Sequence, residues 1–178
     1  SPPPATQVVN CADKAMHAGF CNAHTHLWQM LLKGRRDDLP LDQWCDLVIL
    51  PLIEAVKAPG AEGEHIGYLW TKLGMAEMIR SGVTSFVDMD LESAGAGLAK
   101  ACLEVGMRGA FALEIVDAWY DKDPQACQAS KARVTAFLDA YHDPAPEALV
   151  RVLMGPSEPN MCTHKLLEWT VATAKEYH

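Results

Sequence analysis

Two histidines, His24 and His26, are separated by a single residue in the stretch GFCNAHTHLWQ, directly after a short apolar run. Side chains alternate along a strand, so both imidazoles would project from one face, with Cα atoms about 6.5 Å apart. Imidazole nitrogens bind zinc at about 2.0–2.1 Å, and this spacing allows both to reach one ion. Two ligands do not complete a four-coordinate site, so a pair of solvated or hydrogen-bonded loop histidines is the alternative.

The elements that must position these histidines follow a regular order. Apolar, β-branched runs predict strands at 19–23, 83–89, 108–116 and 149–154. Helical patterns predict helices at 41–57, 61–81, 93–105, 124–142 and 163–178. The strands are nearly all apolar, which indicates burial on both faces. This alternation predicts a parallel α/β protein, with the histidine pair at the C-terminal end of the first strand, where such enzymes place reactive groups.

Individual residues mark where the helices begin and end. Gly82 and Gly106 follow helical runs and are expected as left-handed C′ residues. Pro124 and Thr163 are expected helix starts, and Pro51 should bend or split the helix that begins near residue 41.

Two parallel architectures fit these elements. A flavodoxin-like sheet of about five strands is feasible at 178 residues, whereas a TIM barrel of eight βα units takes about 250, so this chain would be half of one. The glycines of 95–106 lie within a helical pattern, and no GxxxxGK[ST] motif occurs. The sequence therefore lacks the glycine-rich phosphate loop that many doubly wound sheets carry.

Composition excludes several classes of function. The net charge is −8 and no basic block is longer than KGRR at 33–36, which argues against nucleic-acid or anionic-membrane binding. No apolar run approaches the roughly 20 residues that cross a bilayer. The start SPPPATQ lacks the features of a signal peptide and an initiator Met, so we expect the chain to begin inside a longer protein. Six dispersed cysteines without CxxC spacing predict buried, reduced thiols and a cytoplasmic location.

Three segments resemble the amidohydrolase superfamily: GFCNAHTHLWQMLLKGRRDDLPLDQW, GMAEMIRSGVTSFVDM and VLMGPSEP, in family order. The similarity is greatest to the cytosine-deaminase-like branch of ring deaminases and triazine chlorohydrolases, and it extends from residue 7 to 178. The resemblance implies a partial TIM (β/α)8 barrel of about four βα units, with a remnant of a small β-sandwich at the N-terminus. Residues 1–18 would end the sandwich segment, and 19–178 would form the first half of a metal-dependent hydrolase barrel.

The same resemblance implies that His24 and His26 are metal ligands for one Zn²⁺ or Fe²⁺ per intact active site. A bound metal lowers the pKa of its water toward 7 and yields a hydroxide that attacks a ring carbon. In the family, the remaining ligands and the proton-shuttling Glu come from strand five onward. We therefore expect no catalytic residue in this segment, do not assign His178 as a ligand, and expect the isolated segment to be inactive.

Candidate substrate-binding residues are Gln29, Trp44, Ser157 and Glu158. Gln29 completes H-x-H-x-x-Q, which looks like the guanine-type deaminases and triazine hydrolases, although it could be an ordinary helix residue. Ser157 stands where adenosine-type deaminases of this branch carry His, and Gln43 where they carry Glu, which argues against a nucleoside. Trp44 could stack on a flat ring or simply pack in the core.

The carboxylates at predicted strand ends, namely Asp88, Asp90, Asp117 and Glu158, could line the same pocket or be helix N-caps or loop residues. We therefore predict a hydrolase of ring C–N or C–Cl bonds acting on a small heterocycle, with no nucleic-acid or membrane partner. A homo-oligomer is expected, because the first and fourth strands would have free edges with Arg151 as their only charge. The alternative is a non-catalytic half-barrel that acts only through association with another chain.

Overall fold

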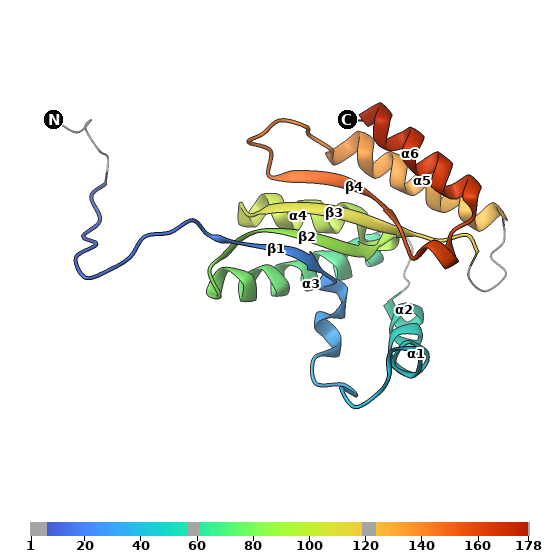
Figure 1. Cartoon of the computed structure of the whole chain (residues 1–178), viewed down its shortest axis with the longest axis horizontal. Coiled ribbons are helices and arrows are strands. Elements are labelled where there is room, and N and C mark those ends of the chain that lie inside the picture. Colours follow the sequence, from blue (N-terminus) through green and yellow to red (C-terminus); the bar gives the residue numbers. More distant parts are fainter. Residues whose placement is uncertain (1–6, 57–60, 119–123, 178) are drawn as a thin grey trace.

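The computed structural model describes residues 7–56, 61–118 and 124–177. Its centre is a parallel sheet of four strands in the order β1-β2-β3-β4 (Figure 1). The strands are β1 (Phe20–Thr25), β2 (Val83–Leu91), β3 (Arg108–Ile115) and β4 (Val150–Pro156). All four predicted strands are confirmed, and a helix follows each along the chain. The fold is the parallel α/β arrangement of a partial barrel.

The helices agree with the predicted ranges, with one interruption. They are α1 (Leu41–Trp44), α2 (Leu50–Val56), α3 (Ala61–Arg80), α4 (Gly95–Val105), α5 (Pro124–Tyr141) and α6 (His164–Tyr177). Short 3₁₀ turns are η1 (Leu27–Leu32), η3 (Glu92–Ala94) and η4 (Pro159–Met161), and η2 (Cys45–Ile49) is a π-helical turn. The π turn ends two residues before Pro51, which has no N–H to donate and whose ring crowds the carbonyl four residues earlier. The sequence predicted a bend or split here, and the structure has a π-helical stretch within a continuous helical run from 41 to 56.

Helix ends follow the local chemistry of the sequence. Gly82 and Gly106 have φ of +79° and +75° and terminate α3 and α4 in the left-handed region that glycine tolerates. Thr163 precedes α6, and its Oγ1 accepts a hydrogen bond from the N–H of Leu166 at 3.3 Å. Helix α5 begins at Pro124 as expected.

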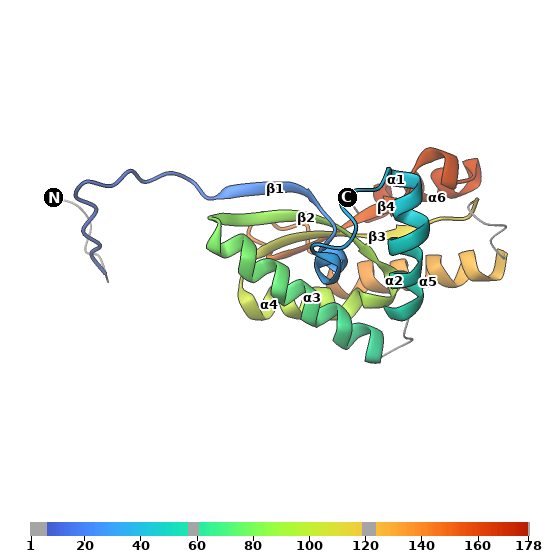
Figure 2. The same cartoon turned by 90° about the horizontal axis from the view of Figure 1, so that it is seen from below.

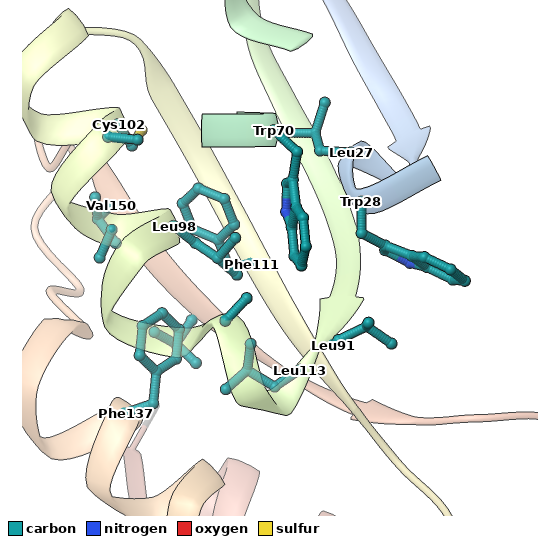
Figure 3. Packing of buried hydrophobic residues seen from close by; sticks show 14 of the residues in the cluster. Leu27, Trp28, Trp70, Leu91, Leu98, Cys102, Phe111, Leu113, Phe137 and Val150 are labelled. Atoms are coloured by element: carbon teal, nitrogen blue, oxygen red, sulfur yellow. The ribbon is translucent and has the colours of Figure 1, made fainter. Parts of the chain in front are cut away.

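Helices α3, α4 and α5 bury their apolar sides against one face of the sheet. Figure 2 shows α3 and α4 beneath β1 and β2. The core lies between these layers and includes Trp70 from α3, Leu98 from α4 and Phe111 from β3 (Figure 3). Leu27, in the turn after β1, is part of the same core, so the segment that follows the histidine pair is fixed by packing. Helices α3 and α4 approach closely, since a Cβ on Gly97 would lie 1.9 Å from the Glu64 carbonyl oxygen.

The prediction that the strands are buried on both faces is wrong. On β2, Phe86 and Asp88 on the helix side are buried, whereas Val87 and Met89 on the other side are half-buried. We call this other side the inner face, since it would line the interior of a closed barrel. Leu153 on the inner face of β4 is 41% exposed. The physical reason is that the helices of the described segments cover only one face of the sheet.

Two fold predictions remain: that residues 1–18 end a sandwich segment, and that the first and fourth strands have free edges. Residues 7–19 contain no strand and are exposed, since no described segment pairs with them. That 1–18 ends a sandwich segment therefore stays a prediction.

β1 and β4 are the two edges of the sheet among the described residues. One outward N–H of β4, that of Val152, donates to Nδ1 of His142 at 3.1 Å, which covers part of that edge. Self-association through these edges stays a prediction as well.

The predictions for the cysteines are borne out only in part. None of the six cysteines forms a disulfide, but the expectation that they are buried is correct only for Cys102 and Cys162. Cys11 and Cys21 are exposed because they lie in the N-terminal segment and on the edge strand. Within the described part of the chain, no helix has the length and apolarity that a membrane span requires.

Candidate metal-binding and substrate site

The histidine pair lies at the C-terminal end of β1, as predicted. His24 is in the strand and His26 is the residue directly after it. Their Nε2 atoms are 3.2 Å apart, and the rings meet edge to face with centroids 4.9 Å apart. His24 is exposed and His26 half-buried, so the pair can be reached from the inner side of the sheet.

A hydrogen bond to the neighbouring strand orients His26. Its Nδ1 lies 2.9 Å from the carbonyl oxygen of Met89 on β2. A carbonyl only accepts, so Nδ1 carries the proton and Nε2 presents its lone pair toward His24. Support of this kind on the second ring nitrogen is typical of metal-binding histidines.

The distance between the two rings fits a shared metal ion. Two nitrogens each about 2.05 Å from one tetrahedral ion lie roughly 3.3 Å apart, close to the 3.2 Å between these Nε2 atoms. His24 and His26 would hold a zinc or ferrous ion between them. Across 7–56, 61–118 and 124–177, no group of three or more His, Cys, Asp or Glu side chains is placed to hold a metal. Two histidines do not complete a four-coordinate site, so as metal ligands they would need partners from elsewhere. His178, which was not assigned as a ligand, lies outside the described residues.

Asp88 and Asp90 do not line a pocket, contrary to the possibility raised from the sequence. Both are fully buried, because they alternate with Val87 and Met89 and so point to the helix side of β2. Asp88 Oδ1 accepts a hydrogen bond from the Leu27 N–H at 2.9 Å. Asp90 accepts from the Trp70 indole N–H at 3.0 Å and from the Leu91 N–H at 2.6 Å. The two carboxylates connect β2 to η1 and α3.

Burial controls the protonation of this pair. Desolvation raises the pKa of Asp88 to about 7, and the Leu27 N–H opposes the shift. Desolvation and the adjacent Asp88 raise the pKa of Asp90 well above its usual range. Asp88 Oδ2 is buried and has no hydrogen-bond donor when both groups are ionised. A hydrogen bond between the two carboxyl groups, which needs one of them to be protonated, contributes to the raised pKa of Asp90 and opposes the rise at Asp88.

A half-buried carboxylate that was not among the predicted site residues, Glu114, lies on the inner face at the end of β3. It follows Ala110 and Ala112 on that face, while Phe111 and Leu113 point into the core. Ser157, just after β4, donates its hydroxyl to Glu114 Oε1 at 2.6 Å. Gly155 stands opposite Glu114 in the register and adds no side chain there. The alternation of small and large residues in RGAFALEI is the signal that could have identified Glu114.

The other predicted substrate-binding residues are spread around this end of the sheet. Gln29 is half-buried in η1, and the structure records no hydrogen bond of its side chain among the described residues. Trp44 is half-buried and packs against the hydrophobic core, which agrees with the packing alternative. Glu158 is exposed and close enough to Cys45 to add to the rise in the pKa of its thiol, whose main cause is burial. The α1–η2 segment thus lies beside the loop after β4.

Asp117 is a loop residue that holds the start of α6, which agrees with the alternative raised for the strand-end carboxylates. Its Oδ1 accepts the Thr163 N–H and its Oδ2 accepts the Thr163 hydroxyl, both at 2.6 Å. These bonds hold the start of α6 to the end of β3. Both carboxylate oxygens of Asp117 are therefore engaged by Thr163, and we do not assign Asp117 to the substrate site.

Comparison with known proteins places this geometry in context. The model of the amidohydrolase family matches residues 15–178. The chain is 31% identical over 175 residues to the 5-methylthioadenosine/S-adenosylhomocysteine deaminase of Pyrococcus furiosus, covering 98% of this chain and 39% of that protein. It is 33% identical over 174 residues to the 5'-deoxyadenosine deaminase of Methanothermobacter thermautotrophicus, covering 98% and 38%. The chain thus spans well under half the length of these relatives.

Solved structures show the same fold at lower identity. The atrazine chlorohydrolase of Arthrobacter aurescens TC1, complexed with zinc, matches with a TM-score of 0.75 and 19% identity, over 90% of this chain and 39% of that chain. The guanine deaminase of C. acetobutylicum, with bound guanine, matches with a TM-score of 0.75 and 14% identity, over 90% and 37%.

Proposed function

Since the chain belongs to the amidohydrolase family, we propose that it forms the first half of the barrel of a metal-dependent hydrolase acting on an N-heterocycle. The intact protein, meaning the polypeptide with whatever chain completes the barrel, releases ammonia or halide from a ring carbon. The observation that carries this proposal is the pair His24 and His26, whose Nε2 atoms stand 3.2 Å apart at the C-terminal end of β1.

The residues of this chain have two tasks in the reaction. His24 and His26 hold the metal, and the Met89 carbonyl keeps the proton of His26 on Nδ1 so that Nε2 stays free to bind. When bound, Zn²⁺ or Fe²⁺ lowers the pKa of a coordinated water toward 7, which supplies a nucleophile at neutral pH. The further metal ligands and the proton shuttle are proposed to come from the half of the barrel that the described residues do not form, and the segment alone is expected to be inactive.

The substrate proposed is a free base or triazine. Gln29 and Ser157 present side chains that hydrogen-bond a ring, and Trp44 and Glu158 lie on segments at the same end of the sheet. Ser157 is already a donor to Glu114, so the pair offers a hydroxyl oxygen and a carboxylate as acceptors for ring N–H or amino groups.

An adenosine-type nucleoside is the second candidate, favoured by the two deaminases that are 31% and 33% identical to this chain over the aligned 175 and 174 residues. Gln43 and Ser157 argue against it, because neither is the Glu or His that we associate with the adenosine-type enzymes. The two candidates differ in the ribose, which only the nucleoside brings into the site.

A substrate panel separates them. Purified intact protein is assayed for ammonia and halide release from guanine, aminated triazines, a chlorotriazine, adenosine and methylthioadenosine. We expect a base or triazine to have the highest kcat/KM. Methylthioadenosine as the best substrate by a wide margin would replace this substrate class with the second candidate. A zinc-loaded protein that releases nothing from any compound would favour the non-catalytic alternative.

A further inference from the structure

His26 and the residue after it, Leu27, are both hydrogen-bonded to β2, one on each face of that strand. On the inner face, His26 Nδ1 hydrogen-bonds the Met89 carbonyl at 2.9 Å. On the helix side, the Leu27 N–H donates to Asp88 Oδ1, also at 2.9 Å. Two consecutive residues of the ligand segment are therefore held by two consecutive residues of β2. The first bond orients the imidazole and the second fixes the backbone that carries it.

Burying the carboxyl group of Asp88 at this position carries a desolvation cost. It is fully buried, and burial raises its pKa to about 7. An apolar residue of similar size would avoid the desolvation cost, so the fold alone gives no reason for a carboxylate there. What only an acceptor can provide is a partner for the Leu27 N–H, which is otherwise an orphan donor at the start of η1.

A second buried carboxylate keeps Asp88 in place. Asp90 lies on the same side of β2 and is held by the Trp70 indole N–H and the Leu91 N–H. Asp88 Oδ1 accepts the Leu27 N–H, and the other oxygen, Oδ2, has no recorded partner and is available to a protonated Asp90. The chain of contacts runs from α3 through β2 to the residue after His26, and every member lies in the core and away from solvent.

We propose that Asp88 is a positioning residue for the metal centre: it fixes the backbone at Leu27 and thereby holds the His26 imidazole at ligating distance from His24. The inference rests on the proposed function, because it assumes that the two histidines bind a metal. Asp88 itself lies on the opposite side of β2 from the imidazoles and touches neither metal nor substrate. Its loss weakens metal binding by letting the ligand segment move, not by removing a ligand.

The test measures zinc affinity in the intact protein by competition with a chromophoric chelator. Asp88→Leu removes the acceptor, and we expect zinc to bind about 10- to 100-fold more weakly, the range seen for partners of metal ligands. Asp88→Ser is the second variant if the leucine protein does not fold, because its hydroxyl is too short to reach Leu27. The absorption bands of bound Co²⁺ give an independent reading of ligand geometry, and we expect them to change in both variants.

Two matched variants distinguish positioning from general stability. Asp88→Asn keeps an Oδ1 acceptor for Leu27 and can donate its amide to Asp90, so it should bind zinc within about threefold of wild type. Leu98→Ala removes core packing on α4, away from the ligand segment, and should lower stability without changing the affinity of the folded protein.

The possible results are separable. Unchanged zinc affinity in folded Asp88→Leu and Asp88→Ser would overturn the positioning role, as would an equal loss in Leu98→Ala or in Asp88→Asn. Wild-type protein that binds no zinc would instead overturn the proposed function, since the histidine pair would then not be a metal site.

Discussion

The two faces of β2 carry neighbouring residues in opposite surroundings. On the helix side, Phe86, Asp88 and Asp90 are fully or almost fully buried. On the inner side, Val87 and Met89 are only half-buried, and the histidine pair and Glu114 lie on the same face of the adjacent strands. The polar groups of the helix side are locked by partners within the chain, whereas those of the inner side are still open to a ligand. A strand of nine residues thus separates structural polar groups from candidate functional ones.

The largest expected effect is on the inner face. His24→Ala in the intact protein should lower turnover at least about 100-fold and remove bound zinc, because a ligand is lost outright and even its supporting partners are worth 10- to 100-fold. The melting temperature of the metal-free protein should hardly change, since His24 is exposed. Zinc content and ammonia release are the measurements. His164→Ala, at an exposed histidine that pairs with Glu168 on α6, is the control and should leave both unchanged.

The next effect is on the helix side. Trp70→Phe removes the indole N–H that binds Asp90 and should lower the free energy of unfolding by about 2 kcal/mol, because a buried acceptor loses its donor. Urea unfolding of the intact protein measures this loss. Leu69→Ala, at the exposed neighbour on α3, should cost much less. If the two variants were equally destabilised, the indole bond would not be a significant part of the buried network.

The buried carboxyl pair predicts a dependence of stability on pH. The unfolded chain releases the Asp88 proton near its ordinary pKa of 3.8, while the folded chain keeps it up to about pH 7. Between these values the folded state binds more protons, so rising pH lowers the free energy of unfolding, by up to about 1.4 kcal/mol per pH unit. Asp90 has a raised pKa as well and contributes to the decline in both proteins, so Asp88→Asn should make the decline shallower than in wild type. Parallel curves for the two metal-free proteins from pH 5 to 7.5 would contradict the prediction.

The smallest expected effect comes from removing a hydrogen bond between a serine and a glutamate, and it should differ between the inner face of the sheet and the helical layer. Ser157→Ala removes the donor to Glu114 on the inner face and should raise KM for a ring substrate roughly two- to tenfold, the equivalent of one hydrogen bond. Ser130→Ala removes a similar bond to Glu92, which lies in the helical layer, and should leave KM unchanged. An unchanged KM in Ser157→Ala would remove this pair from the proposed substrate site.

Much of the fold could be predicted from residue types and spacing. Strand and helix ranges agree with the structure to within a few residues, because hydrophobic runs, Gly82, Gly106 and Pro51 act through local backbone preferences. The placement of His24 and His26 on one side at the end of β1 was predictable for the same reason, since a spacing of two residues matches the period of a strand.

Other features depended on which side of each strand the helices cover. Asp88, Asp90 and Glu114 are all carboxylates near strand ends, and nothing in their types distinguishes the two that are buried from the one on the open face. The answer comes from packing, since α3 and α4 cover the side to which Asp88 and Asp90 point. The hydrogen bonds that His26 donates to Met89 and Leu27 donates to Asp88 join residues more than 60 positions apart.

The sequence by itself determined the order of elements, the strand-end position of the histidine pair and the resemblance to a family, because each depends on residues close together in the chain. Only the tertiary structure decided that the pair stands at metal-binding distance, that the Asp88–Asp90 pair is buried behind it, and that Glu114 and Ser157 meet on the open face. These relations depend on the register of parallel strands and on the side that the helices cover, and both are set by long-range packing.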